Sequence, residues 1–127
     1  VPKKLMVYAS QFHEHFEDAA GFGWTVGPTR FDWPTFIAAK DKEIARLEGI
    51  YGANLTRAGV EIVSQRATVA GPNSIRLADG RSISARHILV ATGGRPSTDE
   101  TLPGRELAIT SNEVFHLPEQ PKRIVIA

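Results

Sequence analysis

The chain has 127 residues, 42% of them apolar and 23% charged, which is typical of a soluble globular domain or of part of a larger one. Fifteen basic and fourteen acidic residues give a net charge of +1, which argues against a protein that binds nucleic acid mainly through phosphate contacts. It has no cysteine, which excludes disulfide scaffolds and thiol nucleophiles within these residues, and no apolar run long enough for a membrane span. Because it starts at Val1 without methionine and stops within a predicted strand, we expect a piece of a longer protein. We also expect that protein to be cytoplasmic.

The first predicted element is a helix over residues 2–18. Apolar side chains recur there at helical spacing, and Pro2 suits the first turn because its missing N–H would have no partner at that position. Gly21 and Gly23 are predicted to end the helix. Residues 22–31, which are rich in glycine, proline and aromatic side chains, are predicted to form a loop.

A second, longer helix is predicted to follow this loop. Either Asp32 or Thr35 can cap its start, and Gly59 is a suitable stop. Its apolar stripe contains a single polar residue, Lys40.

Beyond residue 59 the apolar period changes to that of strands. Short strands are predicted at Val60–Val63 and Arg66–Ala70. A hairpin is predicted next, in which Ser74–Leu77 and Arg81–Ala85 flank the turn Ala78-Asp79-Gly80.

The last third combines a buried strand with irregular segments. His87–Ala91 is a nearly continuous apolar run, as expected of a strand that is buried on both faces. Ser111 is predicted to cap a short helical turn over Asn112–Phe115. Residues 117–122 contain two prolines and are predicted to form a linker, and residues 123–127 a further strand. This order of elements predicts an α+β piece that leads into an α/β unit.

Two sets of residues in the helices could contact a ligand. Lys3 and Lys4 are either a solvated basic pair or cations that face an electron-rich ligand, since a cation at a helix start opposes the helix dipole. Tyr51 lies between Gly49 and Gly52, and each glycine costs about 1 kcal/mol relative to alanine in a helix. The glycines therefore indicate close packing or a nearby ligand, while Tyr51 itself can equally be a half-buried surface aromatic.

A third candidate is Thr92-Gly93-Gly94, which follows the predicted buried strand. Small residues at the carboxyl end of a strand let a nucleotide approach the backbone, although they also occur in plain turns. His13 and His15 are two residues apart on a helix and therefore point to different faces, which excludes them as a pair of metal ligands. The residues alone indicate a nucleotide-associated α/β piece without a metal.

Several motifs together resemble the pyridine-nucleotide disulfide oxidoreductases. Val1-Pro-Lys-Lys-Leu5 is similar to the segment that follows the redox-active dithiol of that family. The other matching motifs are Ile50-Tyr51, Asn54-Leu55-Thr56, Glu61-Ile62, His87–Gly94, Pro96-Ser97, Pro103-Gly104 and Ile109–Ser111. The resemblance covers essentially the whole chain and is closest to the members that reduce glutathione disulfide.

This resemblance implies a domain plan and an activity. Residues 1–116 are expected to be part of an FAD-binding doubly wound domain, 117–122 a linker, and 123–127 the first strand of an NADPH-binding domain. The implied enzyme is a homodimer in redox homeostasis that passes electrons from NADPH through FAD and a dithiol to glutathione disulfide. Because the dithiol and the NADPH site would lie outside these residues, the stretch alone is predicted to be inactive.

The resemblance also implies roles for particular residues. Lys3 is expected beside the flavin, where its ammonium would stabilise developing negative charge during hydride transfer. The residues implied to contact FAD are Lys3, Ala67, Thr92, Gly93 and Ser111. The residues implied to line the glutathione site are Val1, Leu47, Ile50, Tyr51 and Asn54.

Other interpretations remain open at this stage. Trypanothione reductase usually carries a polar residue where Ile50 stands and methionine where Asn54 stands, so glutathione is favoured over trypanothione. Dihydrolipoamide dehydrogenases differ further along the helix of Tyr51. Arg66 replaces a histidine found in some relatives, which leaves an adenine contact there to the backbone alone. A free-standing, non-catalytic α/β module is the remaining alternative.

Overall fold

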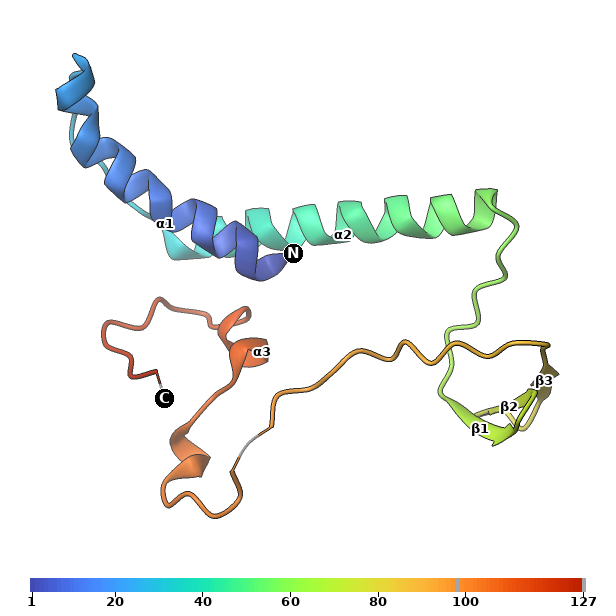
Figure 1. Ribbon diagram of the computed structural model, residues 1–127. Coiled ribbons are helices and arrows are strands. Elements are labelled where there is room, and N and C mark those ends of the chain that lie inside the picture. Colours follow the sequence, from blue (N-terminus) through green and yellow to red (C-terminus); the bar gives the residue numbers. More distant parts are fainter. Residues whose placement is uncertain (98, 127) are drawn as a thin grey trace. The chain divides into compact units, whose positions relative to one another are not determined.

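The computed structural model describes residues 1–97 and 99–126, which form two units (Figure 1). One unit contains Val1–Tyr51 together with residues 99–126, and the other contains Gly52–Ser97. The first unit is helical, and the second is built around a small antiparallel sheet, which agrees with the predicted mixture of helices and meander.

Helix α1 spans Pro2–Asp18 and confirms the predicted first helix. The chain then tightens into the 3₁₀ turn η1 at Ala19–Phe22. Gly23 follows with φ +82°, a left-handed conformation that glycine adopts without steric cost, so this glycine ends the helical segment.

Helix α2 spans Trp33–Arg57 and is the longest element of the chain. The Thr35 N–H donates to Asp32 Oδ2 at 2.9 Å, so Asp32 is the cap and Thr35 is the residue that it caps. Hydrogen bonding from the Thr35 side chain, followed by that from its N–H, lowers the pKa of Asp32 and keeps its carboxylate charged at the positive end of the helix. At the other end, Gly59 has φ +76° and confirms the predicted stop.

The helical unit has an aromatic cluster near the start of α2. Phe31, Trp33 and Phe36 lie with their ring centroids 5.9–6.5 Å apart, which is the usual range for favourable aromatic pairs. Trp33 also donates its indole N–H to the Leu117 carbonyl at 2.8 Å. This hydrogen bond ties the segment before residue 122 to the first turn of α2.

The second unit contains the meander of strands β1 (Ala67–Gly71), β2 (Ser74–Leu77) and β3 (Ser82–Ser84), in the order β1-β2-β3. Both pairings are antiparallel, with Ala67 opposite Leu77 and Ile75 opposite Ile83. Leu77 is 5% exposed and is the buried apolar residue of this sheet. The predicted hairpin is therefore confirmed within a residue or two at each end.

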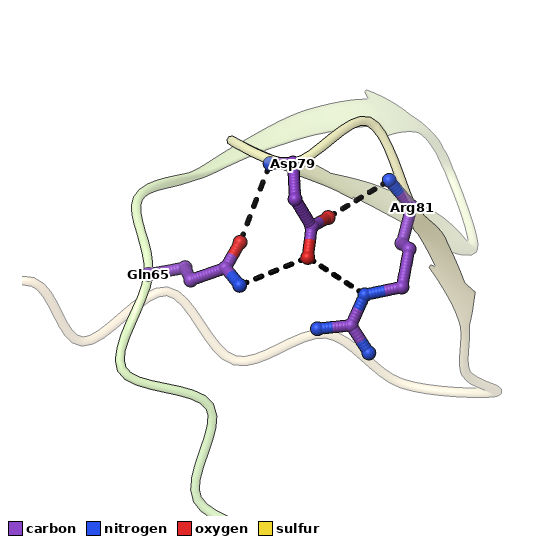
Figure 2. Close-up of polar contacts among 3 residues, drawn as sticks. All are labelled: Gln65, Asp79 and Arg81. Atoms are coloured by element: carbon purple, nitrogen blue, oxygen red, sulfur yellow. Dashed lines mark hydrogen bonds and ion pairs between the residues drawn. The ribbon is translucent and has the colours of Figure 1, made fainter.

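A carboxylate holds the β2–β3 turn together (Figure 2). Asp79 Oδ2 accepts hydrogen bonds from Gln65 Nε2 at 2.9 Å and from Arg81 Nε at 2.7 Å, and its Oδ1 accepts from the Arg81 N–H at 3.0 Å. The Gln65 hydrogen bond, followed by those from Arg81, lowers the pKa of Asp79 to about 2. Gly80 completes the turn with φ +89°.

Three predicted strands are not formed in the part of the chain that the structure describes. At Val60–Val63, the Val60 N–H donates to the Leu55 carbonyl at 3.0 Å, so this residue closes helix α2 and does not open a strand. His87–Ala91 is irregular, with Leu89 90% exposed, because no neighbouring strand is present to accept its backbone hydrogen bonds. Residues 123–126 are irregular and exposed, and residue 127 lies outside the described residues.

Two short helical turns follow: η2 at Arg105–Leu107 and α3 at Ser111–Val114. Thr110, and not the predicted Ser111, caps α3. The Asn112 N–H donates to Thr110 Oγ1 at 3.2 Å, and the Thr110 N–H donates to Glu113 Oε2 at 2.7 Å, which completes a capping box. The predicted cap was one residue late because serine and threonine are both good caps and stand next to each other.

Candidate functional site

Lys3 lies in the first turn of α1, directly after Pro2, and its side chain is exposed. Val1 precedes it as the N-cap, is 62% exposed, and accepts the Lys4 N–H at 3.1 Å through its carbonyl. Lys4 differs from Lys3, since its Nζ lies 5.5 Å from the centre of the Tyr8 ring in a cation–π contact. Within residues 1–97 and 99–126, the Lys3 ammonium has no ion-pair partner, so it is available to a ligand.

The four predicted substrate residues of α2 fall on one face of the helix. Leu47, Ile50, Tyr51 and Asn54 follow the spacing i, i+3, i+4 and i+7, which places them on neighbouring turns of the same side. Leu47 is half-buried, Ile50 is 41% exposed and Tyr51 is 58% exposed. This face therefore presents an apolar surface with a phenol hydroxyl and an amide group, a combination suited to a peptide-like ligand.

The glycines beside Tyr51 are not explained by packing within the described residues. A Cβ added at Gly49 or at Gly52 would have no atom within 4 Å. Of the two reasons that the sequence offered for these glycines, close packing is therefore absent here. Among the described residues, the space next to Tyr51 is therefore open.

Electrostatic contacts order the turn of α2 that precedes this face. Arg46 makes a two-pronged ion pair with Glu43, in which Arg46 Nε and Nη2 each lie 2.7 Å from a carboxylate oxygen. These hydrogen bonds lower the pKa of Glu43 and keep it ionised. The ion pair involves neither Tyr51 nor Asn54. The Tyr51 hydroxyl and the Asn54 amide therefore remain free of this contact.

The remaining predicted cofactor residues lie in two places. In the sheet unit, Ala67 is exposed at the first position of β1, and Thr92 and Gly93 are exposed in the irregular segment after residue 91. Gly93 has φ +71°, a conformation that side chains disfavour, so its glycine is required by the backbone. In the helical unit, Ser111 is half-buried at the first position of α3.

Sequence reasoning missed two features of the helical unit. A groove of about 450 Å³ lies between α1 and the start of α2 and is lined mainly by apolar and aromatic side chains, including Phe12, Phe31 and Phe36. Beside it, Lys40 is 3% exposed and is the one buried charged residue in the described part of the chain. The sequence carried a signal for Lys40, because it was the one polar member of an otherwise apolar stripe.

Two classes of site are absent from the described residues. Residues 1–97 and 99–126 contain no group of three histidine, aspartate or glutamate side chains placed to hold a metal ion. None of the helices described here is long and apolar enough to cross a membrane.

Comparison with known proteins identifies the family. The family described as pyridine nucleotide-disulphide oxidoreductase matches residues 1–127, and the chain belongs to this family. It is 54% identical to glutathione reductase of Burkholderia cepacia over 126 residues, which is 99% of this chain and 28% of that protein.

Two further relatives bear the same name. The chain is 51% identical to glutathione reductase of Nostoc sp. (strain PCC 7120) over 126 residues, and 43% identical to the chloroplastic/mitochondrial glutathione reductase of Pisum sativum over 127 residues. These matches cover 99% of this chain in both cases, and 27% and 23% of the two relatives. The chain thus spans about a quarter of the length of the curated relatives that it matches.

Proposed function

We propose that this chain is the central segment of an FAD-dependent enzyme that uses NADPH to reduce glutathione disulfide to two molecules of glutathione. The observation that carries the proposal is the 54% identity to a glutathione reductase over 99% of the chain. The chain contains no cysteine, so another part of the protein would supply the redox dithiol. By the family resemblance, the NADPH site would also lie outside these residues. We further propose a cytoplasmic homodimer.

Two of the proposed cofactor residues have properties, each within its own unit, that would suit an FAD cofactor. Lys3 offers an exposed ammonium that has no ion-pair partner within residues 1–97 and 99–126, and Gly93 offers a backbone with a positive φ and open space where a Cβ would stand. Both properties suit close approach by a large anionic nucleotide. Thr92 and Ser111 would add hydroxyl donors, and Ala67 a backbone contact at the adenine end.

FAD, when bound, supplies the two-electron step between nicotinamide and dithiol. By the family resemblance, Lys3 would place its positive charge near the electron-rich edge of the cofactor, where it would favour negative charge on the flavin.

The substrate would lie along the exposed face of α2. Leu47 and Ile50 would contact the aliphatic parts of the peptide substrate, and the Asn54 amide would hydrogen-bond its polar groups. Tyr51 directs a hydroxyl donor toward the disulfide, where it can hydrogen-bond the sulfur that leaves as a thiolate. Val1 would close the site from the start of α1.

Steady-state kinetics on the full-length protein test this proposal. We expect a yellow protein that oxidises NADPH when glutathione disulfide is added, and that is much slower with trypanothione disulfide or oxidised lipoamide. A folded, flavin-containing protein that prefers either of those two substrates would assign it to another branch of the family. A folded protein that binds no flavin would contradict the proposal outright.

A further inference from the structure

One hydrogen bond of the helical unit joins residues that are far apart in the sequence. The half-buried Trp33 side chain donates its indole N–H to the Leu117 carbonyl at 2.8 Å, across 84 positions of the chain. Within residues 1–97 and 99–126, the other side-chain hydrogen bonds join residues that are at most 14 positions apart. Because both partners belong to the same unit, this contact links the start of α2 to the segment that follows α3.

The donor of this hydrogen bond is held by its neighbours at the start of α2. The Trp33 ring lies with its centroid 6.5 Å from that of Phe31 and 6.0 Å from that of Phe36. Trp33 is also the first residue of the helix and directly follows the Asp32 cap, whose carboxylate accepts the Thr35 N–H at 2.9 Å. A tryptophan that is held at both its backbone and its ring presents the indole N–H in a narrow range of directions.

The acceptor is held by its neighbours as well. Leu117 is half-buried and precedes Pro118, and the residue before a proline is restricted to extended conformations. The turn just before it is closed, because the His116 N–H donates to the Glu113 carbonyl at 3.0 Å. The Leu117 carbonyl therefore stands at the end of a hydrogen-bonded turn, with few backbone conformations open to it.

Beyond this carbonyl, the predicted linker 117–122 has further features that limit its freedom. Pro118 and Pro121 each fix a backbone φ angle, and linkers rich in proline act as semi-rigid spacers. Gln120 lines the same groove as Trp33. The linker thus starts from a hydrogen-bonded point at the beginning of α2 and stays beside it for several residues.

We propose that Trp33 is a positioning residue, which anchors the linker 117–122 to the start of α2 and thereby holds the NADPH-binding part of the protein in place for hydride transfer to the flavin. This inference rests on the proposed function, in which the NADPH site follows this linker. Hydride transfer requires the reacting atoms to lie about 3–3.5 Å apart, so a small loss of alignment greatly slows it. A short tether that starts at a fixed point allows fewer arrangements of the two parts than a released one.

Trp33→Phe in the full-length enzyme tests this role. Phenylalanine keeps an aromatic ring beside Phe31 and Phe36 but has no N–H to donate. In stopped-flow absorbance, we expect NADPH to reduce the flavin at least threefold more slowly, and glutathione disulfide to reoxidise it within twofold of the unchanged rate. The second step is spared because Tyr51 lies 18 residues further along α2, about 27 Å along the helix axis.

Trp24→Phe is the matched control for this variant. It makes the same chemical change at a tryptophan that is 73% exposed, so we expect it to change neither half-reaction. A general loss of stability in Trp33→Phe would slow both half-reactions equally, and that result would contradict a role confined to the linker.

Two measurements test the anchor without reference to activity. In NMR spectra of the full-length protein, the indole signal lost in each variant identifies Trp33 and Trp24, and we expect the Trp33 indole proton to exchange with solvent at least tenfold more slowly. We also expect trypsin to cut after Lys122, within the linker, at least threefold faster in Trp33→Phe than in the unchanged protein. Trp24→Phe should be cut at the unchanged rate.

Equal exchange of the two indole protons would overturn the inference, and so would equal cleavage after Lys122 in Trp33→Phe and in the unchanged protein. Both results would count against it even if the protein reduced no glutathione disulfide. Failure of the proposed function would appear separately, as an unchanged protein whose reduced flavin is not reoxidised by glutathione disulfide.

Discussion

Two segments of the sheet unit carry strand-like sequences, and they behave differently. The meander Ala67–Ser84 forms three paired strands, whereas the more apolar segment His87–Ala91 forms none in the described structure. The meander contains its own turns, among them the Asp79 and Gly80 turn, and each strand pairs with the next one along the chain. The apolar segment contains no turn that returns the chain to it.

The difference shows which strands a short sequence can form by itself. An antiparallel hairpin is stabilised by nearby residues, so its hydrogen bonds form within the segment. A strand of a parallel sheet is paired by segments distant in the sequence, and its apolar residues on both faces need covering layers. Leu89 is 90% exposed and Val90 67% exposed, which leaves them suited to burial by further parts of the proposed enzyme.

The largest expected change in stability is at Leu89, which is exposed in this chain and would be buried in the proposed full-length enzyme. In the isolated 127-residue chain, Leu89→Ala removes an exposed side chain and should change the free energy of unfolding by less than about 0.5 kcal/mol. In the proposed full-length enzyme the same change would open a cavity in a parallel sheet and cost about 2–5 kcal/mol. Urea unfolding of both proteins measures the two values. Equal small values would show that this segment is not a buried strand in the enzyme.

The meander can be broken at its turn. Gly80 has φ +89°, so Gly80→Val introduces a β-branched side chain in a left-handed conformation, at a cost of about 1–2 kcal/mol. Hydrogen exchange of the β2 and β3 amides should speed up accordingly. Gly27→Val is the control, because Gly27 has open space and no positive φ, and it should leave this exchange unchanged.

A smaller effect, in the opposite direction, is expected in α2. Gly49→Ala places a methyl group in open space and should stabilise the helix by about 1 kcal/mol, because glycine is the poorer helix former. Thermal unfolding followed by circular dichroism measures this gain, and Ala45→Gly, at an exposed position of the same helix, should give a loss of similar size. A raised KM for glutathione disulfide in the more stable Gly49→Ala enzyme would support a ligand beside Tyr51. Destabilisation by Gly49→Ala would contradict the open environment of this glycine.

The smallest expected effect is the pH dependence of the meander. The pKa of Asp79 is lowered from 3.8 to about 2 by its hydrogen bonds to Gln65 and Arg81. Since the folded pKa lies below the unfolded one, the carboxylate stabilises the fold fully above about pH 4 and loses this contribution as the pH falls toward 2. Carbon-13 NMR titration of the Asp79 carboxyl measures its midpoint directly.

Gln65→Ala removes the largest cause of this shift, so the Asp79 midpoint should move up toward 3.8. Gln11→Ala, on an exposed part of α1, is the matched control. An Asp79 midpoint near 3.8 in the unchanged chain would show that the hydrogen bonds in Figure 2 do not persist in solution.

The sequence predicted the locally determined parts of the structure well. Both long helices, their glycine stops and the hairpin follow from spacing, capping and turn residues, and the structure confirms them. The predicted cap of α3, Ser111, was wrong by one residue, because the Thr110 side chain offers the same hydroxyl one residue earlier. The strands at His87–Ala91 and 123–126 could not be decided from their own residues, since their pairing partners are not local.

For the candidate site, the family resemblance named Leu47, Ile50, Tyr51 and Asn54, and in the structure their spacing along helix α2 puts them on one face. The burial of Lys40 was signalled only indirectly, by its place as the one polar member of an apolar stripe. The roles of the predicted cofactor and substrate residues remain predictions.

The two half-reactions of the full-length protein, followed by stopped-flow absorbance of the flavin, test the proposed function most directly. We predict that NADPH reduces the enzyme and that glutathione disulfide then restores the oxidised spectrum, with Lys3→Ala slowing the first step and Tyr51→Phe mainly the second. A protein whose reduced flavin is not reoxidised by glutathione disulfide would contradict this account.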